Sequence, residues 1–154
     1  MYYILSFLLA CDFKLPKGIT AGQVFQIQPV ATTLPNDSSA KLTITGSFII
    51  KDACTIGIKD LVYTPQIQQV FLYSSDKSNI NDSSALGYQI SNKEVAHSAF
   101  SGTMQEVTLS KSIEDSKSLK LFGSQDKFVL GASTITSGTN SLNLEVLIVM
   151  LICQ

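Results

Sequence analysis

The strongest constraint on the fold is an alternation of apolar and polar residues with a period of two. It is clearest in the segment KLTITGSFII, residues 41–50, where successive apolar side chains fall on one face of an extended chain. The apolar positions are Leu42, Ile44, Phe48 and Ile50, and the polar positions between them are Thr43, Thr45 and Ser47. This pattern predicts a β-strand with one face in the core and the other toward solvent.

Two following segments continue the strand pattern with informative differences. TIGIKDLVYT, residues 55–64, begins in phase with Ile56 and Ile58, but the phase slips at Leu61, which predicts a β-bulge. QQVFLYSS, residues 68–75, is apolar on both faces. We therefore expect it to form an interior strand that is covered on both sides.

Further short extended segments bring the expected total to about eight strands. They are residues 23–30, 106–111, 118–122 and 127–133. Polar runs rich in Ser, Asn and Asp separate the segments and predict turns, and residues 113–119 are a weak candidate for a helix. We therefore predict an all-β fold, an antiparallel β-sandwich or barrel of about eight short strands, in one domain over residues 20–135.

The N-terminal residues 1–10, MYYILSFLLA, are apolar apart from Ser6 and end on the small residue Ala10. Such a segment predicts a secretory signal peptide that is cleaved after Ala10. Two alternatives stay open. The segment is a buried first strand, or LLAC, residues 8–11, is a bacterial lipobox in which Cys11 carries lipid, although the basic residues usual in lipoprotein signals are missing.

The C-terminal residues 136–154 combine a polar spacer with a hydrophobic end. The hydrophobic stretch from Leu142 to Cys153 would span about 18 Å as a helix, too little for a bilayer core of about 30 Å. We therefore expect a cleaved glycolipid (GPI) anchor signal with Ser137 as the attachment residue, so that the anchor is the only contact with a membrane. The alternative is a last β-strand, because apolar and polar residues alternate from Leu142 to Val146.

The cysteines and the glycosylation sequons also indicate a protein that is extracellular or at the cell surface. Removal of the tail also removes Cys153, which leaves Cys11 and Cys54 available for one disulfide, whereas later cleavage of the signal leaves Cys54 as a lone thiol. Asn36 and Asn81 each begin an Asn-Asp-Ser sequon within a polar run typical of a loop. We therefore expect a glycoprotein that is extracellular or at the cell surface.

Few residues are candidates for catalysis or for holding a cofactor. His97 is the only histidine, and it is a candidate general base beside Ser98 or Ser101, with an ordinary surface loop as the alternative. Glu114 and Asp115 are adjacent carboxylates of the kind found in solvated turns. No cysteine pair has metal-site spacing, and no phosphate-binding glycine loop or nucleophile motif occurs, so we expect no metal and no cofactor.

Charge and aromatic residues restrict the expected partners. The chain has 11 basic and 12 acidic residues, a net charge of −1, which gives no electrostatic basis for binding nucleic acid. Four aromatic residues are candidates for a face that binds sugars, with core packing as the alternative for most of them. They are Tyr63, Phe71, Tyr73 and Tyr88. The expected partner is an unidentified surface molecule or a polysaccharide.

An ordered set of motifs between Gly46 and Ala132 resembles the DM-thirteen domain, a small extracellular β module of secreted and surface proteins in microbial eukaryotes. The shared elements are Gly46-Ser47-Phe48, the aromatic strand 70–73, Gly87, Val107-Thr108-Leu109 and Phe128 to Gly131. The resemblance implies a secreted β module. A late cysteine proposed as a redox centre in that family is replaced here by Phe122-Gly123, so the resemblance does not imply electron transfer by this chain.

These observations favour a non-catalytic protein that is secreted or anchored at the surface. It would act in binding, or as a component of the cell surface or wall. The alternative is an extracellular redox or hydrolytic accessory protein, for which His97 and Cys54 are the residues to test.

Overall fold

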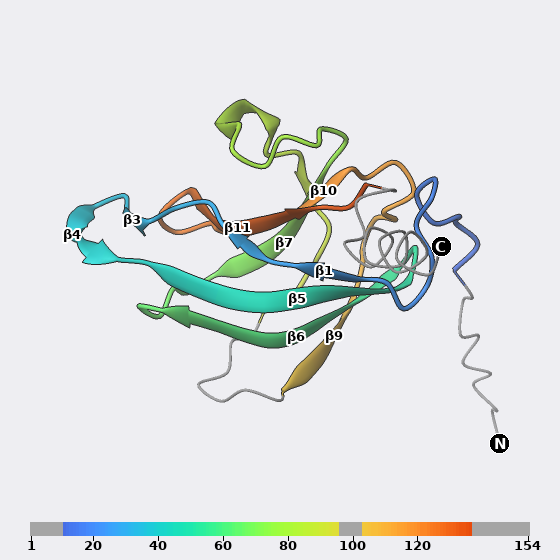
Figure 1. Ribbon diagram of the computed structural model, residues 1–154, viewed down its shortest axis with the longest axis horizontal. Coiled ribbons are helices and arrows are strands. Elements are labelled where there is room, and N and C mark those ends of the chain that lie inside the picture. Colours follow the sequence, from blue (N-terminus) through green and yellow to red (C-terminus); the bar gives the residue numbers. More distant parts are fainter. Residues whose placement is uncertain (1–10, 96–102, 137–154) are drawn as a thin grey trace, which may run out of the picture.

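The protein is built from two antiparallel sheets that pack against each other (Figure 1). The computed structural model describes residues 11–95 and 103–136, and within them it contains eleven strands and one 3-10 turn, η1 (Ser83–Ala85). The predicted all-β antiparallel fold is confirmed, and of the two predicted forms it is the sandwich, because the sheets do not close into a barrel. Among the described residues, no helix has the length and apolar character needed to cross a lipid bilayer.

The first layer is a four-stranded sheet built on one long hairpin. Its strand order is β1-β5-β6-β9, and β5 and β6, of ten residues each, pair along nearly their whole length. The strands are β1 (Val24–Gln26), β5 (Thr43–Asp52), β6 (Thr55–Thr64) and β9 (Met104–Thr108). The N-terminal segment is attached to the turn between β5 and β6 by a disulfide.

The second layer is a five-stranded sheet with the order β2-β11-β10-β7-β8. Its strands are β2 (Gln28–Pro29), β7 (Val70–Ser75), β8 (Tyr88–Gln89), β10 (Ser118–Gly123) and β11 (Phe128–Thr134). β7 pairs with β10 on one side and β8 on the other, as predicted for an interior strand. A separate two-stranded ribbon, β3 (Thr33–Leu34) and β4 (Asp37–Lys41), lies at one end of the molecule (Figure 1).

Main-chain pairing links the two sheets along both sides of the sandwich. On one side a single extended segment changes sheets at the buried residue Ile27, because β1 pairs with β5 and β2 pairs with β11. On the opposite side, Ser91 and Leu109 form an antiparallel bridge between the continuations of β8 and β9. Residues 23–30, predicted as one strand, therefore belong to both sheets.

The bulge predicted in β6 is present and corrects the phase of its side chains. Between two register pairs, Asp60 and Leu61 together face the single residue Gly46, and Asp60 adopts a φ of 55°. Apolar side chains before and after the bulge consequently face the core. These are Ile56, Ile58, Leu61 and Tyr63, each at most 3% exposed.

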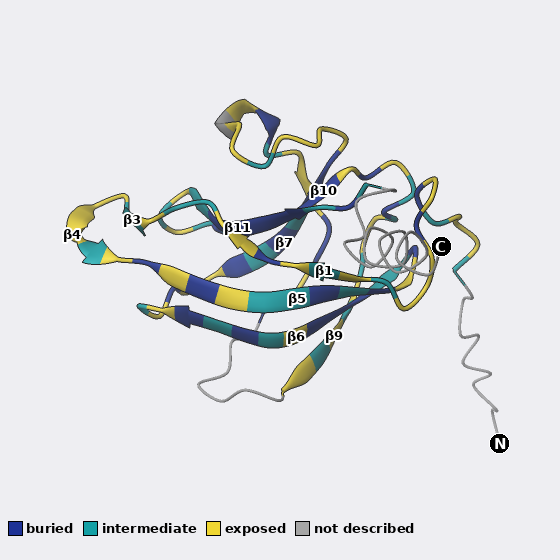
Figure 2. Ribbon diagram, viewed as in Figure 1, coloured by how far each residue is buried: buried dark blue, intermediate teal, exposed yellow. Residues whose placement is uncertain are grey.

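The core lies between the two sheets and consists mainly of branched aliphatic side chains. The four apolar positions predicted for residues 41–50 are all buried. Figure 2 shows buried positions on both layers, whereas β4, at one end of the molecule, is mostly exposed. Fully buried large apolar residues come from both layers and their connections: Phe48, Ile50, Ile56, Ile58, Leu61, Leu72, Ile90, Ile113, Leu119, Leu121 and Leu130. Their burial is the main stabilising contribution to the sandwich.

The structure differs from the sequence prediction in the number of elements. It has eleven strands where about eight were expected, because one predicted strand is divided, the short strands β3 and β4 were not foreseen, and β8 was implied only by the resemblance, as the strand that follows Gly87. Residues 113–119, the weak helix candidate, form a turn followed by the start of β10. The turn is closed by a hydrogen bond from the Ser116 N–H to the Ile113 carbonyl oxygen (2.9 Å).

Candidate functional site

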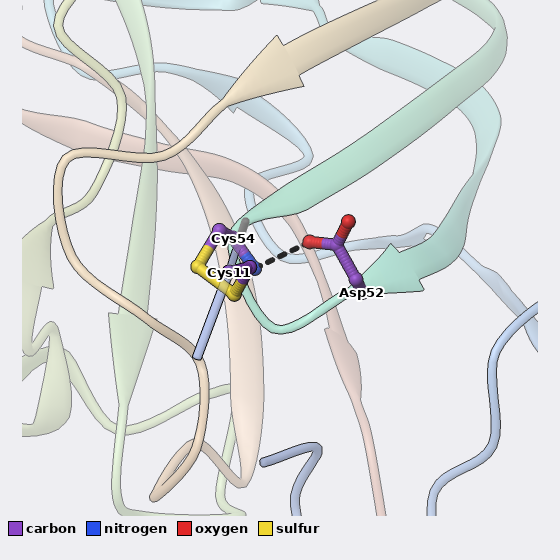
Figure 3. A group of neighbouring side chains, drawn as sticks. All are labelled: Cys11, Asp52 and Cys54. Atoms are coloured by element: carbon purple, nitrogen blue, oxygen red, sulfur yellow. Dashed lines mark hydrogen bonds between the residues drawn. A yellow bond between two sulfur atoms is a disulfide. The ribbon is translucent and has the colours of Figure 1, made fainter. Parts of the chain in front are cut away.

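A disulfide attaches the N-terminal segment to the turn of the long hairpin. Cys11 is bonded to Cys54, with a Cα–Cα distance of 5.9 Å and a sequence separation of 43 residues. Cys54 lies in the turn between β5 and β6, where its N–H donates to a carboxylate oxygen of Asp52 at 2.7 Å (Figure 3). The structure thus joins Cys11 and Cys54, the two cysteines that the sequence left available for a disulfide.

Cys11, Asp52 and Cys54 also form a cluster of possible metal ligands. In the described part of the chain, no other group of three or more His, Cys, Asp or Glu side chains lies this close together. The donor atoms of Cys11, Asp52 and Cys54 all lie within 4.8 Å of one another. Metal ligation by cysteine requires the thiolate, and both sulfur atoms are engaged in the disulfide. In this state the group is a covalent link between two segments.

Both sequon asparagines lie on the surface. Asn36 is exposed between β3 and β4, and its amide nitrogen lies 3.5 Å from a carboxylate oxygen of Asp126. Asn81 is exposed in the connection between β7 and β8, where its N–H donates to the side-chain oxygen of Asn79 at 3.0 Å. Each side chain has the accessibility that attachment of a glycan requires.

Several predicted features lie outside the described residues. These are the candidate base His97, the attachment residue Ser137, the signal segment 1–10 and the tail 137–154. They remain predictions.

The four aromatic candidates for a sugar-binding face do not form one face. Tyr63 is buried, its hydroxyl donates to the Ile67 carbonyl oxygen at 3.2 Å, and burial together with the charge of Glu94 raises the pKa of its phenol to about 12. Phe71 and Tyr73 are half-buried on the outer face of the five-stranded sheet, and the Tyr73 ring centroid lies 5.0 Å from that of Phe122. Tyr88 is separate from these and exposed.

Tyr88 shares an open recess with a second exposed aromatic residue, Phe13. The two side chains are 39% and 57% exposed, respectively, and the recess has a volume of about 360 Å³. The remaining lining residues come from the hairpin turn and from the connection between β9 and β10. They are Cys54, Leu109, Ser110, Lys111, Ser112 and Asp115. We refer to this feature as the Phe13–Tyr88 recess.

The disulfide positions Phe13 at the recess. Phe13 follows Cys11 by two residues, so the bond to Cys54 fixes this part of the chain beside the hairpin turn. Leu15 packs against the core and Ile19 is buried within it. The N-terminal segment is therefore held at several points, and Phe13 remains exposed between them.

Close main-chain packing positions Tyr88. The preceding residue, Gly87, has a φ of 81°, and a Cβ atom at this position would overlap the carbonyl oxygen of Ser74. Only glycine combines this conformation with such a close approach. β8 can consequently pair with β7 through Tyr88 and Ser74, and the Tyr88 ring reaches the recess.

The connection between β9 and β10 brings charged and hydroxyl groups to the recess. It is anchored on the hairpin turn by hydrogen bonds from the Leu109 N–H to the Cys54 carbonyl oxygen (2.8 Å) and from the Ile113 N–H to the Ala53 carbonyl oxygen (2.9 Å). The Lys111 ammonium lies 4.9 Å from the centroid of the Tyr88 ring, a distance typical of a cation–π contact. The recess thus combines aromatic rings with an ammonium group, a carboxylate and hydroxyls.

Sequence reasoning found part of this site. Tyr88 was one of the aromatic candidates, Cys54 was a disulfide candidate and Asp115 was assigned to a solvated turn. Phe13 was missed, because an isolated Phe beside a cysteine gives no sign of its exposure in the folded protein.

A second polar cluster lies on the outer face of the five-stranded sheet, around the buried residue Lys120. The connection between β7 and β8, residues 76–87, folds back over this face, and sheet side chains donate to its carbonyl groups. The donor and acceptor pairs are Ser118 Oγ to Lys77 (2.7 Å), Thr134 Oγ1 to Ser78 (2.9 Å) and Lys120 Nζ to Ala85. These bonds hold the connection in place, so the cluster has a structural role.

Lys120 is fully buried although its alternating strand predicts an outward side chain. Burial lowers the pKa of its ammonium group, and the negative charge of Asp82 partly offsets this shift. The carboxylate of Asp82 accepts hydrogen bonds from the N–H (2.9 Å) and the hydroxyl (2.6 Å) of Ser84, which lower its own pKa.

No family model matches this chain, and neither a curated protein nor a solved structure matches it.

Proposed function

We propose that this protein is a non-catalytic binding protein of the cell exterior, secreted or held at the surface by a C-terminal anchor, and that its contact site is the Phe13–Tyr88 recess. The main observation in support is that the Cys11–Cys54 disulfide lies beside the recess and holds Phe13 there. Disulfides of this kind persist in oxidising compartments. The same covalent bond therefore supports both the location and the site.

Two further features support the location. Asn36 and Asn81 are exposed in separate connections, where a glycan can be attached. Charged residues make up 15% of the chain, against roughly 25% in typical soluble domains. A surface of hydroxyl and amide groups is suited to contact with a hydrated cell wall or glycan layer.

The binding role is supported by exposed aromatic area. Tyr and Phe side chains supply much contact area when they are covered, and interfaces are enriched in aromatic residues. Two of the four large apolar side chains exposed in the described chain, Phe13 and Tyr88, meet in one recess, whereas Val24 and Met104 lie on other strands. This grouping favours a binding site over scattered surface residues.

The resemblance to the DM-thirteen domain is part of the same proposal. Two of its shared positions have clear roles in this chain: Gly87 allows β8 to approach β7, and the strand around Val70 supplies part of the core. Gly123 stands in the position of the family's late cysteine, so the chain has no thiol there, and the preceding residue, Phe122, packs against Tyr73. This arrangement supports a binding module better than a redox protein.

The proposal is tested by measuring how fluorescently labelled protein binds to the surface of cells that normally express it. Wild type is expected to bind, and Tyr88→Ala and Phe13→Ala are each expected to lower binding strongly. Val24→Ala removes a side chain of similar exposure (47%) on β1 and serves as the matched control. Equal binding by all four proteins would refute the assignment of the recess.

A further inference from the structure

The Phe13–Tyr88 recess presents ring surface that solvent can reach. Lys111 is itself exposed, and its ammonium group lies over the Tyr88 ring. The negative face of an aromatic ring attracts positively polarised hydrogens as well as cations. A ligand with polarised C–H groups can therefore take the place of the ammonium group on this ring.

Polar groups line the same recess as the two rings. Lys111 offers donors and Asp115 offers acceptors, and both are exposed. The Ser110 hydroxyl donates to the Ile90 carbonyl oxygen at 3.1 Å, so its lone pairs remain directed toward other donors. Ser112 adds a second hydroxyl. A ligand that stacks on Tyr88 would find hydrogen-bonding groups at its edges.

This combination matches the chemistry of sugars. A pyranose ring has a C–H face that stacks on an aromatic ring, and hydroxyl groups around its edge that both donate and accept hydrogen bonds. Lys111 and Asp115 offset each other in charge, which favours a neutral saccharide over a phosphorylated or strongly anionic one. The volume of about 360 Å³ lies at the small end of the range of about 300–1,000 Å³ for ligand sites, which suits one or two sugar rings.

Other ligand classes fit the recess less well. A lipid chain would need an enclosed apolar cavity, whereas this recess is open and carries two charged side chains. A nucleotide could stack on Tyr88, but its phosphates would meet a single lysine beside an aspartate.

We infer that the Phe13–Tyr88 recess binds a neutral carbohydrate, with a sugar ring stacked on Tyr88 in place of the Lys111 ammonium group, which then donates to sugar hydroxyls. Phe13 forms a second apolar contact, and Ser110, Ser112 and Asp115 accept hydrogen bonds from the sugar. This inference rests on the proposed binding function and names the ligand class of the same site.

The test is a saccharide array with immobilised neutral oligosaccharides of glucose, mannose, galactose, xylose and N-acetylglucosamine, followed by titration of the best binders. Wild type is expected to bind at least one class. Tyr88→Ala and Phe13→Ala are expected to weaken binding by about tenfold or more, whereas Val24→Ala leaves it unchanged. Tyr88→Phe keeps the ring and is expected to retain most of the affinity. The circular dichroism spectrum of each variant verifies its fold.

Two results would overturn the carbohydrate inference: wild type binds no saccharide on the array, or it binds one with an affinity that neither Tyr88→Ala nor Phe13→Ala changes. Treatment of cells with periodate, which cleaves the vicinal diols of sugars, separates this inference from the proposed function. Loss of cell binding after treatment supports the carbohydrate assignment. If binding after treatment is unchanged and still depends on Tyr88, the carbohydrate inference is contradicted and the proposed binding function stands. If untreated cells do not bind wild type at all, both the carbohydrate inference and the proposed function are contradicted.

Discussion

Cys11 and Cys54 are 43 residues apart in sequence and 5.9 Å apart between Cα atoms, and the disulfide between them fixes Phe13 beside the turn of the longest hairpin. A bond that links distant segments restricts the unfolded chain, and at the same time it assembles one side of the recess. Stability and binding are therefore expected to depend on the same covalent contact.

Replacement of Cys54 by serine is expected to lower the free energy of unfolding by about 4 kcal/mol, because a loop of this length loses its closure in the unfolded state. Urea denaturation of wild type and Cys54→Ser measures the change. Cys11→Ser and the double variant should show the same loss as Cys54→Ser, since each removes the same bond. A double variant much less stable than either single variant would show that the two thiols contribute separately.

Gly87→Ala is expected to destabilise the protein and to weaken binding, because the added Cβ overlaps the Ser74 carbonyl group and displaces β8 with Tyr88. Gly22→Ala is a matched control: its φ of 87° is similar, but a Cβ there would have no atom within 4 Å. The control should lose roughly 1–2 kcal/mol from backbone strain alone. Denaturation curves that give Gly87→Ala the same loss as Gly22→Ala would contradict the proposed packing of β8.

The buried Lys120 is expected to make stability depend on pH in the alkaline range. Burial lowers its folded-state pKa below the ordinary value of 10.5, so the folded protein releases this proton at lower pH than the unfolded chain does. The free energy of unfolding should therefore rise as pH increases from the folded-state pKa toward 10.5, and the gain should level off above that value.

Lys120→Met removes the titrating group and keeps an apolar stem of similar length under residues 76–87. We would denature wild type and Lys120→Met with urea at a series of pH values and compare their free energies of unfolding. The contributions of other titrating groups cancel in the difference between the two proteins. That difference should shift in favour of wild type as pH rises. A difference that is constant with pH would show that Lys120 titrates alike in both states.

Glycosylation at the exposed sequons is expected when the protein is produced in a eukaryotic secretory host. Asn36→Gln and Asn81→Gln should each reduce the intact mass by one glycan, and the double variant should lose both. Asn79→Gln is the control, because Asn79 lies in the same connection as Asn81 but begins no sequon. An unmodified wild-type mass would contradict the accessibility argument for both positions.

Features encoded by neighbouring residues could be predicted from the sequence, whereas those that depend on distant segments could not. The bulge at Leu61 was visible because the phase of alternation changes within a single strand. The change of sheets at Ile27 was not visible, because residues 23–30 read as one extended segment and only the pairing partners differ. The burial of Lys120 could not be predicted from its own strand, because it depends on the return of residues 76–87 over the sheet.

The candidate site shows the same limit. Cys54 and Tyr88 were identified from residue type, since a cysteine and a tyrosine carry recognisable chemistry. Their meeting with Phe13 depends on a disulfide, on the tight approach allowed by Gly87 and on hydrogen bonds to the hairpin turn. None of these contacts is local in sequence.

The central claim is that the protein works outside the cell with its Cys11–Cys54 bond intact. It is tested most directly by mass spectrometry of the protein recovered, under non-reducing conditions with thiols blocked, from the cells that express it. The account predicts a peptide pair joined through Cys11 and Cys54, from a surface or secreted fraction, with a mature C-terminus at Ser137. Recovery of an intracellular protein that still ends in Ile152-Cys153-Gln154, with Cys11 and Cys54 both blocked as free thiols, would contradict it.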